Sequence, residues 1–320
     1  MIQISVVVPV FNEEESLPEL TQWISRVMKE NGFSYEVIFI NDGSTDKSWD
    51  VISKLSHEFN VIKGINFTRN YGKSAGLDAG FKKASGQVVI TMDADLQDSP
   101  DEIPGLYKMI MEDGFDVVSG WKKERHDPIG KTIPSRFFNG VTRWISGIQL
   151  HDFNCGLKAY RLKVVKNIHI YGEMHRYIPL LAKWNGFGKI GEKVVQHQAR
   201  KYGYSKFGLE RFLNGFLDLI SVSFVHRYKK KPMHFFGLLG MISFLTGFII
   251  TIWLIFEKIY GLNQGIPVRE IVDQPLFFLA LVALIIGVQL FVTGFIAELM
   301  TSNQAKEIEY KIDEELNLNS

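Results

Sequence analysis

The sequence predicts an α/β domain with a mostly parallel sheet, followed by a C-terminal part that associates with a membrane. In the N-terminal part, short runs of branched apolar residues alternate with segments of helical spacing. Polar and acidic clusters directly follow several of these runs. Toward the C-terminus, two stretches of more than 20 residues carry no charge. These three observations predict the order of the parts along the chain.

Five short apolar runs are expected to form the strands of the sheet. Runs of this kind are typical of strands that are buried on both faces, as parallel strands between helices are. The first run follows the initial Met without a basic segment, so we read it as a strand and not as a secretory signal. The five runs are residues 4–10, 35–40, 61–67, 86–92 and 116–120.

Three helices are expected between these strands. Ser16 precedes Glu19 by three positions, with Pro18 in the first turn, which predicts a capping box and a helix that ends near Lys29. Two further helices are expected near residues 47–59 and 73–84, the second of them ended by Gly86. Sheets of this class bind ligands beyond the carboxyl ends of their strands, so the residues just after each strand are the candidates for function.

Charge and cysteine content narrow the class of protein. The 36 Lys and Arg residues nearly balance the 35 Asp and Glu residues, so no basic field indicates nucleic acid as a partner. The single cysteine, Cys155, excludes an intramolecular disulfide, which fits a reducing cytoplasm. We read Cys155 as a small packing residue and not as a nucleophile.

The two uncharged stretches, residues 235–256 and 275–297, are long enough to cross a bilayer. The alternative is a pair of buried helices in a soluble core. Arg227 and the three lysines at 229–231 precede the first stretch and place that flank in the cytoplasm. We therefore expect a multi-pass protein of the inner, cytoplasmic membrane with its N-terminal domain in the cytoplasm. Neither stretch contains an ionisable residue, which argues against a transporter.

An amphipathic helix is expected to connect the soluble domain to the first span. Its apolar residues recur at helical spacing, which predicts a helix lying at the membrane interface, although a core-facing helix would show the same pattern. The expected parts are the domain 1–206, the interface helix 207–231, the membrane part 232–298 and a cytoplasmic tail 299–320.

An acidic cluster follows the fourth predicted strand. Asp93, Asp95 and Gln97 are spaced by two, so in extended structure they would share one face. Hard oxygen ligands of this kind suit Mg²⁺ or Mn²⁺, with water and substrate phosphates completing the coordination. A bare D-x-D is common in surface loops, and its position after an apolar strand is what favours the metal site.

A second cluster, residues 41–46, follows the second predicted strand. Asp42 is a candidate acceptor for a group of a base or ribose, and Asp46 is either a helix cap or a ligand contact. The alternative is an ordinary turn, because Asn-Asp-Gly-Ser is frequent in turns.

Five motifs occur in a familiar order: "VVVPVFNEEESL", "VIFINDGSTD", "NYGKSAGLDAGFKKASG", "MDADLQDSP" and "NCGLKAYR". In these five motifs, the chain resembles inverting nucleotide-sugar glycosyltransferases with the GT-A fold. It is most similar to the polyisoprenyl-phosphate branch, the group of dolichyl-phosphate mannose synthase. The resemblance covers roughly residues 3–230, and the two spans match a bacterial-type subgroup.

The resemblance implies roles for individual residues. On the donor side, residues that hold the nucleotide sugar are Pro9, Glu13, Asp42, Lys73 and Asp93. The metal and diphosphate site is implied to consist of Asp93, Asp95 and Gln97, with Asp95 the best candidate for direct ligation and catalysis.

On the acceptor side, the resemblance implies a second catalytic position, Asp152, which acts as a base or positions the acceptor. Basic residues implied to approach the lipid phosphate are Arg125, Arg136 and Arg200, and Ser205 and Lys206 belong to a G-x-S-K segment. Cys155 and Lys158 depart from the pattern, because many relatives have Ser and Arg there. His175 and Arg176 begin a predicted helix and are either structural or catalytic.

Together with these residues, the resemblance implies a hexosyltransferase that moves a sugar from a nucleotide sugar to polyprenyl phosphate, with Mg²⁺ or Mn²⁺ as cofactor. A UDP-glucose-like donor is the first expectation and GDP-mannose the second. Two alternatives are another membrane lipid or glycan as acceptor, and a non-catalytic scaffold that binds nucleotide sugars. The intact D-x-D argues against the scaffold. The sequence leaves the oligomeric state open, including a homo-oligomer.

Overall fold

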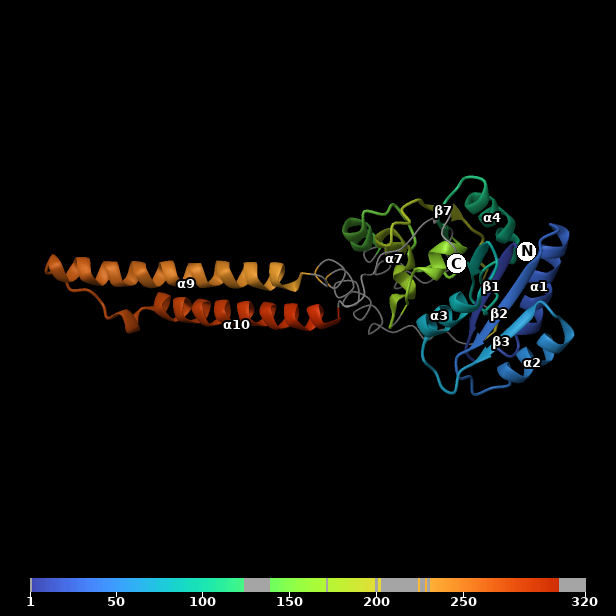
Figure 1. Cartoon of the computed structure of the whole chain (residues 1–320), viewed down its shortest axis with the longest axis horizontal. Coiled ribbons are helices and arrows are strands. Elements are labelled where there is room, and N and C mark those ends of the chain that lie inside the picture. The colour runs from blue at the N-terminus through green and yellow to red at the C-terminus, as the bar shows by residue number, and fades with distance from the viewer. Residues whose placement is uncertain are drawn as a thin grey trace, which may run out of the picture. The chain divides into compact units, whose positions relative to one another are not determined.

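The structure, a computed structural model, describes two compact units of the chain, Met1–Leu219 and Ile220–Ser320. The described residues are 2–123, 139–170, 172–198, 201–202, 224, 228 and 231–304 (Figure 1). Most of the predicted interface helix, 207–231, lies outside them, as does the tail from residue 305. The predicted boundaries at 206 and 231 therefore stay predictions, and each unit is described by itself.

In the described part of the first unit, one sheet of seven strands has the order β3-β2-β1-β4-β6-β5-β7. β6 is antiparallel to both of its neighbours, and the remaining pairs are parallel. The five predicted strands are confirmed as β1 to β5, whereas β6 and β7 were not predicted. The strands are β1 Ile4–Val10, β2 Tyr35–Asn41, β3 Ile62–Asn66, β4 Val88–Thr91, β5 Val117–Trp121, β6 Lys158–Arg161 and β7 Ile190–Val194.

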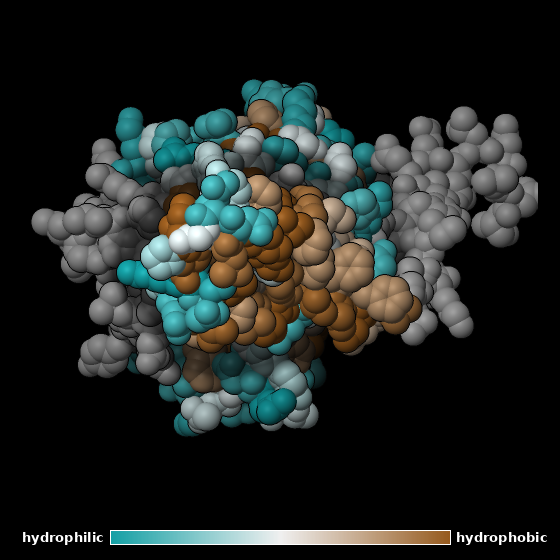
Figure 2. All heavy atoms as spheres, turned by 90° about the vertical axis from the view of Figure 1, so that its left-hand side faces the viewer, coloured by the Kyte–Doolittle hydropathy of each residue, from teal (hydrophilic) through white to brown (hydrophobic). Residues whose placement is uncertain are grey.

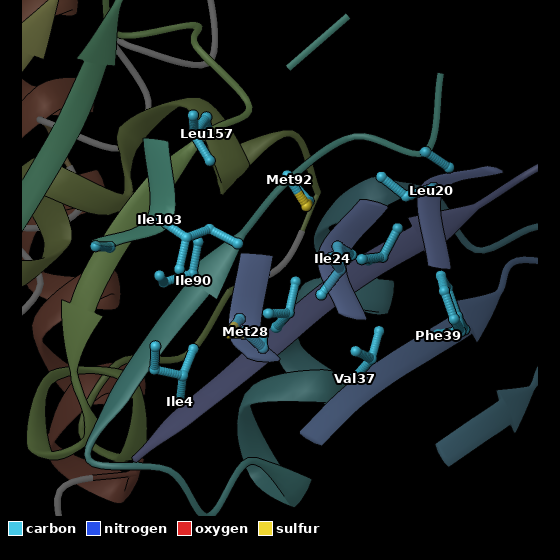
Figure 3. Close-up of a cluster of buried hydrophobic side chains, with 14 of the residues drawn as sticks. Ile4, Leu20, Ile24, Met28, Val37, Phe39, Ile90, Met92, Ile103 and Leu157 are labelled. Carbon is cyan, nitrogen blue, oxygen red and sulfur yellow. The ribbon is translucent and has the colours of Figure 1, made fainter. Parts of the chain in front are cut away.

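One face of the sheet is covered by α1 (Leu17–Glu30), α2 (Ser48–Glu58) and α4 (Ile103–Met111). Leu20, Ile24 and Met28 lie one turn apart on α1 and are fully buried. Figure 3 shows them against the side chains of β1, β2 and β4. Burial of such apolar surface is the main contribution to the stability of this layer.

α3 (Lys73–Lys83) lies on the other side of β1 and β2 from α1 (Figure 1). It approaches the sheet at Gly76 and Gly80, where an added β-carbon would meet Pro9 and Ile40, or Val7. The close approach needs glycine at Gly80, whereas a β-carbon on Gly76 would make ordinary contacts, and it brings the N-terminus of α3 to the carboxyl ends of β1 and β2. The remaining described elements of this unit are η1 Pro100–Glu102, α6 Leu162–Lys166, η2 Met174–Tyr177 and α7 Ile178–Trp184.

Two predictions about helix ends are wrong. Ser16 has helical backbone angles and no capping bond to the helix, and its hydroxyl instead donates to the Glu13 carbonyl oxygen at 3.0 Å. Ser16 thus stabilises the loop before α1 and does not cap the helix. α3 ends at Lys83 because Ala84 is extended, and Gly86 belongs to the next turn, where its N–H donates to Ser5 Oγ.

The second unit is an antiparallel pair of long helices, α9 (Pro232–Asn263) and α10 (Pro275–Gln304), joined through η3 (Ile271–Asp273). Their backbones touch at glycines, since a β-carbon on Gly247 would lie 2.6 Å from the Ala280 carbonyl oxygen. Across the pair, Ser243 Oγ donates to the Ala283 carbonyl oxygen at 2.8 Å. Small residues and hydroxyl groups of this kind are typical of helix packing in lipid.

Both helices are long and apolar enough to cross a membrane. Only 17% and 11% of the residues in their most apolar windows are buried. Figure 2 faces the end where α9 joins α10 and shows hydrophobic side chains along the outside of the pair. Core helices of a soluble protein would be covered by protein on most sides, so the structure argues against that alternative.

Candidate active site

Two loops at the carboxyl edge of the sheet are joined by reciprocal hydrogen bonds. After β1, the Asn12 N–H donates to Ser44 Oγ at 3.0 Å, and Asn12 Oδ1 accepts from the Thr45 N–H at 2.8 Å. Asn12 has a left-handed backbone with φ of 56°. The Glu13 N–H donates to Ser48 Oγ at 2.9 Å. The "NEE" and "NDGSTD" segments therefore position each other.

Asp46 takes part in the same network. Its carboxylate accepts from the Ser48 N–H at 3.0 Å, at the start of α2, and from the Glu14 N–H at 3.2 Å. These contacts fit the cap-like alternative for Asp46. The loops and Tyr202 also line a pocket of about 110 Å³. Because Glu13, Glu14 and Asp46 line it, this pocket does not suit a diphosphate.

Asp42 holds the loop that leads into α3. Its side chain is almost fully buried, and its two oxygens accept from the N–H groups of Tyr71 at 2.7 Å and Gly72 at 2.9 Å. Burial raises the pKa of Asp42 more than these two bonds lower it. Each carboxylate oxygen keeps a further lone pair, so Asp42 can still accept from a ligand.

Lys73, the first residue of α3, forms an ion pair with Asp93 Oδ1. The other oxygen, Oδ2, lies against Gly156, where a β-carbon would be only 2.6 Å away. Burial alone would raise the pKa of Asp93, but Lys73 outweighs it, with help from Lys122, and lowers the pKa to about 2. Asp93 is thus an anion at neutral pH, and the Lys73 ammonium is paired with it.

The predicted one-sided, extended arrangement of Asp93, Asp95 and Gln97 is wrong. β4 ends at Thr91, and the chain then turns, with Leu96 in a left-handed conformation at φ of 60°. Inside the turn, Asp95 Oδ1 accepts from the Gln97 N–H at 3.2 Å, and Asp95 is 6% exposed. Short side-chain-to-backbone bonds of this kind favour turns over strands. The three side chains remain close along the chain but are presented by a turn.

A buried ion pair behind this turn was missed by the sequence analysis. Lys122 Nζ lies 2.8 Å from Asp98 Oδ1, and the Asp98 side chain is fully buried. Burial lowers the pKa of Lys122, but Asp98, with Cys155 and Asp93, raises it more in sum, so Lys122 stays charged. The sequence places Asp98 in one acidic cluster with Asp93 and Asp95, but nothing local indicates Lys122 as its partner.

Asp152 is 2% exposed and sits in a loop fixed by other buried groups. Its Oδ1 accepts from the Asn154 N–H at 3.0 Å. Lys158, on β6, donates from Nζ to the carbonyl oxygens of Phe153 and Cys155. Lys158, which stands where many relatives have Arg, therefore holds the loop that carries Asp152. Burial raises the pKa of Cys155 to about 12, as expected of a packing residue.

A family model described as "Glycosyl transferase family 2" matches residues 5–169, which include the Asn12, Asp42, Asp93 and Asp152 segments. The chain belongs to glycosyl transferase family 2. It is therefore a glycosyltransferase, and its mixed, mostly parallel sheet is the GT-A type of fold that the sequence predicted.

The relatives of this family 2 chain include dodecaprenyl-phosphate galacturonate synthase of Rhizobium johnstonii. The two are 36% identical over 302 residues, which is 93% of this chain and 88% of the relative. Undecaprenyl-phosphate 4-deoxy-4-formamido-L-arabinose transferase of Pseudomonas aeruginosa is 35% identical over 254 residues, 79% of this chain and 73% of the relative.

A solved structure shares the fold of this family 2 domain. It is glucosyl-3-phosphoglycerate synthase from Mycobacterium tuberculosis in complex with Mn²⁺, uridine diphosphate and glucosyl-3-phosphoglycerate. The TM-score is 0.55 at 19% identity, over 70% of this chain and 80% of that chain. At this identity the likeness shows the fold alone.

The oxygen-bearing side chains of the turn after β4 fit a hard divalent ion. Asp93 and Asp95 offer carboxylate oxygens and Gln97 an amide oxygen, all from one turn. No group of three His, Cys, Asp or Glu side chains in the described ranges is arranged to hold a metal. A site with few protein ligands, completed by phosphate and water, is the arrangement that Mg²⁺ tolerates. The Asp93 side chain is 37% exposed, so an ion can reach it.

Five predicted acceptor residues lie outside the described residues. They are Arg125, Arg136, Arg200, Ser205 and Lys206. Of the remaining predicted site residues, Pro9 is in β1, Glu13 follows it, and Lys73 and Asp93 are in direct contact. The structure thus brings donor-side candidates from β1, β2, α3 and β4 to one edge of the sheet, as the strand-end rule predicts.

Proposed function

We propose that this family 2 enzyme is an inverting glycosyltransferase that moves a hexose from a nucleotide sugar to polyprenyl phosphate at the cytoplasmic face of the inner membrane. The observation that carries the proposal is the similarity to dodecaprenyl-phosphate galacturonate synthase over 93% of the chain. Only about 7% is left uncovered, so most of α9 and α10 must belong to the match. The match to a relative named for a lipid phosphate thus extends over the catalytic domain and most of α9 and α10.

The site residues suit the donor half of this reaction. Breaking the bond between the anomeric carbon and the diphosphate leaves negative charge on the diphosphate. A divalent ion at Asp93, Asp95 and Gln97, when bound, would offset part of that charge. Lys73 contributes a second positive charge, because its flexible stem allows the ammonium to move from Asp93 to a phosphate oxygen.

The acceptor half needs little proton transfer. A phosphate monoester has a second pKa of about 6, so the lipid phosphate is largely a dianion at pH 7. One of its oxygens forms the new bond to the anomeric carbon, from the face opposite the leaving diphosphate. Asp152 is buried and accepts from the Asn154 N–H, so we assign it a positioning role and not that of a base.

The donor sugar is the finer part of the proposal. A UDP-glucose-like donor is our first choice and GDP-mannose the second. The two relatives are named for different sugars, galacturonate and 4-deoxy-4-formamido-L-arabinose, at nearly equal identity. Similarity at this level does not fix the sugar, so a donor panel must include a uronic acid.

The test is transfer of label into lipid. Membranes containing the protein are incubated with labelled UDP-glucose, UDP-galacturonate, UDP-4-deoxy-4-formamido-L-arabinose or GDP-mannose, each with and without polyprenyl phosphate. We expect one donor to label the organic phase only when polyprenyl phosphate is added. Equal labelling with added diacylglycerol would favour another lipid acceptor, and no labelling with any donor would count against transfer.

Membrane topology gives a further prediction. Arg227 and the lysines at 229–231 precede α9, and two crossings return the chain to the same side. Reporters fused near Lys122 and after Ser320 should both report the cytoplasm, and one near Gly265, between α9 and α10, should report the opposite side. A cytoplasmic signal at Gly265 would show that α9 and α10 do not span the membrane.

The acceptor-phosphate assignment gives another prediction, which rests on the resemblance alone. Arg136→Gln should raise the apparent KM for polyprenyl phosphate, because arginine binds phosphate oxygens bidentately. Nucleotide binding by calorimetry should stay within about 1 kcal/mol of wild type. Arg26→Gln, which removes an exposed ion pair with Asp101, is the control. The assignment is wrong if Arg136→Gln weakens nucleotide binding and leaves the acceptor KM unchanged.

A further inference from the structure

His175 lies in the charged cluster and is oriented from one side of its ring. It belongs to η2, and its side chain is 11% exposed. The His175 backbone N–H donates to Ser74 Oγ at 3.1 Å, and the same hydroxyl lies 3.1 Å from His175 Nδ1. The Ser74 hydroxyl has one proton and a second lone pair, so it can donate to Nδ1 or accept from it. We assign it as the donor to Nδ1, which places the ring proton on Nε2.

The surroundings keep this imidazole uncharged. Burial lowers the pKa of His175, and the positive charges of Lys73, Arg176 and Lys158 lower it further. Asp93 raises the pKa less than these effects lower it, so the pKa stays well below its usual value. The Glu173 carboxylate, 3.9 Å from Nδ1, does not reverse this shift. At neutral pH the ring thus presents one N–H donor, Nε2, and no charge.

Within the described part of the chain, Nε2 has no hydrogen-bond partner, because both ring contacts involve Nδ1. Nε2 is not among the buried polar atoms without a partner, and the side chain is 11% exposed, so this nitrogen is open to water or to a ligand that enters the site. Ser74 directly follows Lys73, whose ammonium holds Asp93. Ser74, which orients the ring, is therefore one residue along the chain from Lys73 of the proposed diphosphate site.

We propose that His175 is a specificity-determining residue of the donor site, whose Nε2–H donates to an uncharged oxygen of the transferred sugar. This inference rests on the proposed function. A neutral donor suits a hydroxyl oxygen, whereas a phosphate would be held by the charged groups around it. The same ring cannot act as a base at Nε2, which carries the proton, and Nδ1 is occupied by Ser74.

Calorimetry on the full-length protein tests the contact to the sugar directly, by comparing the affinity for a nucleotide sugar with that for the free nucleotide. The probes are UDP-glucose and UDP, with GDP-mannose and GDP as a second pair. His175→Ala should weaken binding of the nucleotide sugar by about 3- to 10-fold, the loss of one neutral hydrogen bond, and leave the free nucleotide unchanged. His175→Gln, whose amide nitrogen can replace Nε2, should recover part of the loss. Ser74→Ala should give a smaller loss of the same kind.

Unchanged nucleotide affinity also shows that the variants are folded. Equal weakening of nucleotide and nucleotide sugar by His175→Ala would overturn the assignment, because the ring would then serve the nucleotide or the fold. An unchanged ratio of the two affinities would overturn it as well. Binding needs no acceptor, so a failure to form lipid product would count against the proposed acceptor and not against His175.

Discussion

Replacing Asp95 with Asn should lower sugar transfer by on the order of 10²-fold or more, if Asp95 holds the ion that offsets charge on the leaving diphosphate. Asp95 is nearly buried in the turn after β4, and its Oδ1 is held by the Gln97 N–H. An asparagine keeps the size and that backbone bond but removes the negative charge. Initial rates of transfer at saturating donor measure the effect.

Chelation provides the matching experiment for the same turn. EDTA should abolish transfer, and Mg²⁺ or Mn²⁺ should restore it. Asp101→Asn is the control variant, because Asp101 lies in the same stretch but bonds to Trp23 and Arg26 on α1. Full activity in EDTA, or equal losses in the two variants, would contradict a metal role for Asp95.

Gly43→Ala should have the second largest effect, a loss of nucleotide binding of at least about 10-fold. Gly43 has φ of 66°, and a β-carbon there would lie 2.5 Å from the Asn70 nitrogen and against the Arg69 backbone. The loop before α3 must then move away, which breaks the bonds from Tyr71 and Gly72 to Asp42. Calorimetry with UDP measures the loss.

Gly32→Ala separates the clash from backbone strain. Gly32 has nearly the same φ, 65°, but no atom lies within 4 Å of its added β-carbon. Both variants carry a left-handed strain of about 1–2 kcal/mol, and only Gly43→Ala displaces the loop. Nucleotide binding by Gly43→Ala that matches Gly32→Ala would show that this loop does not form the nucleotide site.

β1, β2, β4 and β5 could be predicted because each is a compact apolar run that is largely buried. β3 was predicted from its apolar residues although it is mostly exposed at the edge of the sheet, with Ile62 its buried residue. β6 and β7 could not be predicted. β6, "KAYR", is four residues long and begins with a charged residue that is buried only because Phe153 and Cys155 supply carbonyl oxygens. β7, "IGEKV", is half exposed at the edge of the sheet, so its pattern carries little apolar signal.

The site was predictable in part, because parallel strands end at one edge. That rule placed Asp42 and Asp93 at one edge of the sheet, and in the structure both contact residues at the start of α3. It could not foresee that Asp42 anchors the loop before α3, or that Lys122 pairs with Asp98, because these partners are distant in sequence. The orientation of His175 by Ser74, 101 positions earlier, is likewise a product of the fold.

The most direct test of the central proposal is the mass of the lipid product formed by the purified protein. The protein is incubated with the active donor and with either polyprenyl phosphate or the matching polyprenol, which lacks the phosphate nucleophile. The account predicts a new lipid with the mass of polyprenyl phosphate plus one sugar residue, formed from the phosphate and absent with the alcohol. A glycosylated product from polyprenol, or none from polyprenyl phosphate while another lipid acceptor is glycosylated, would contradict it.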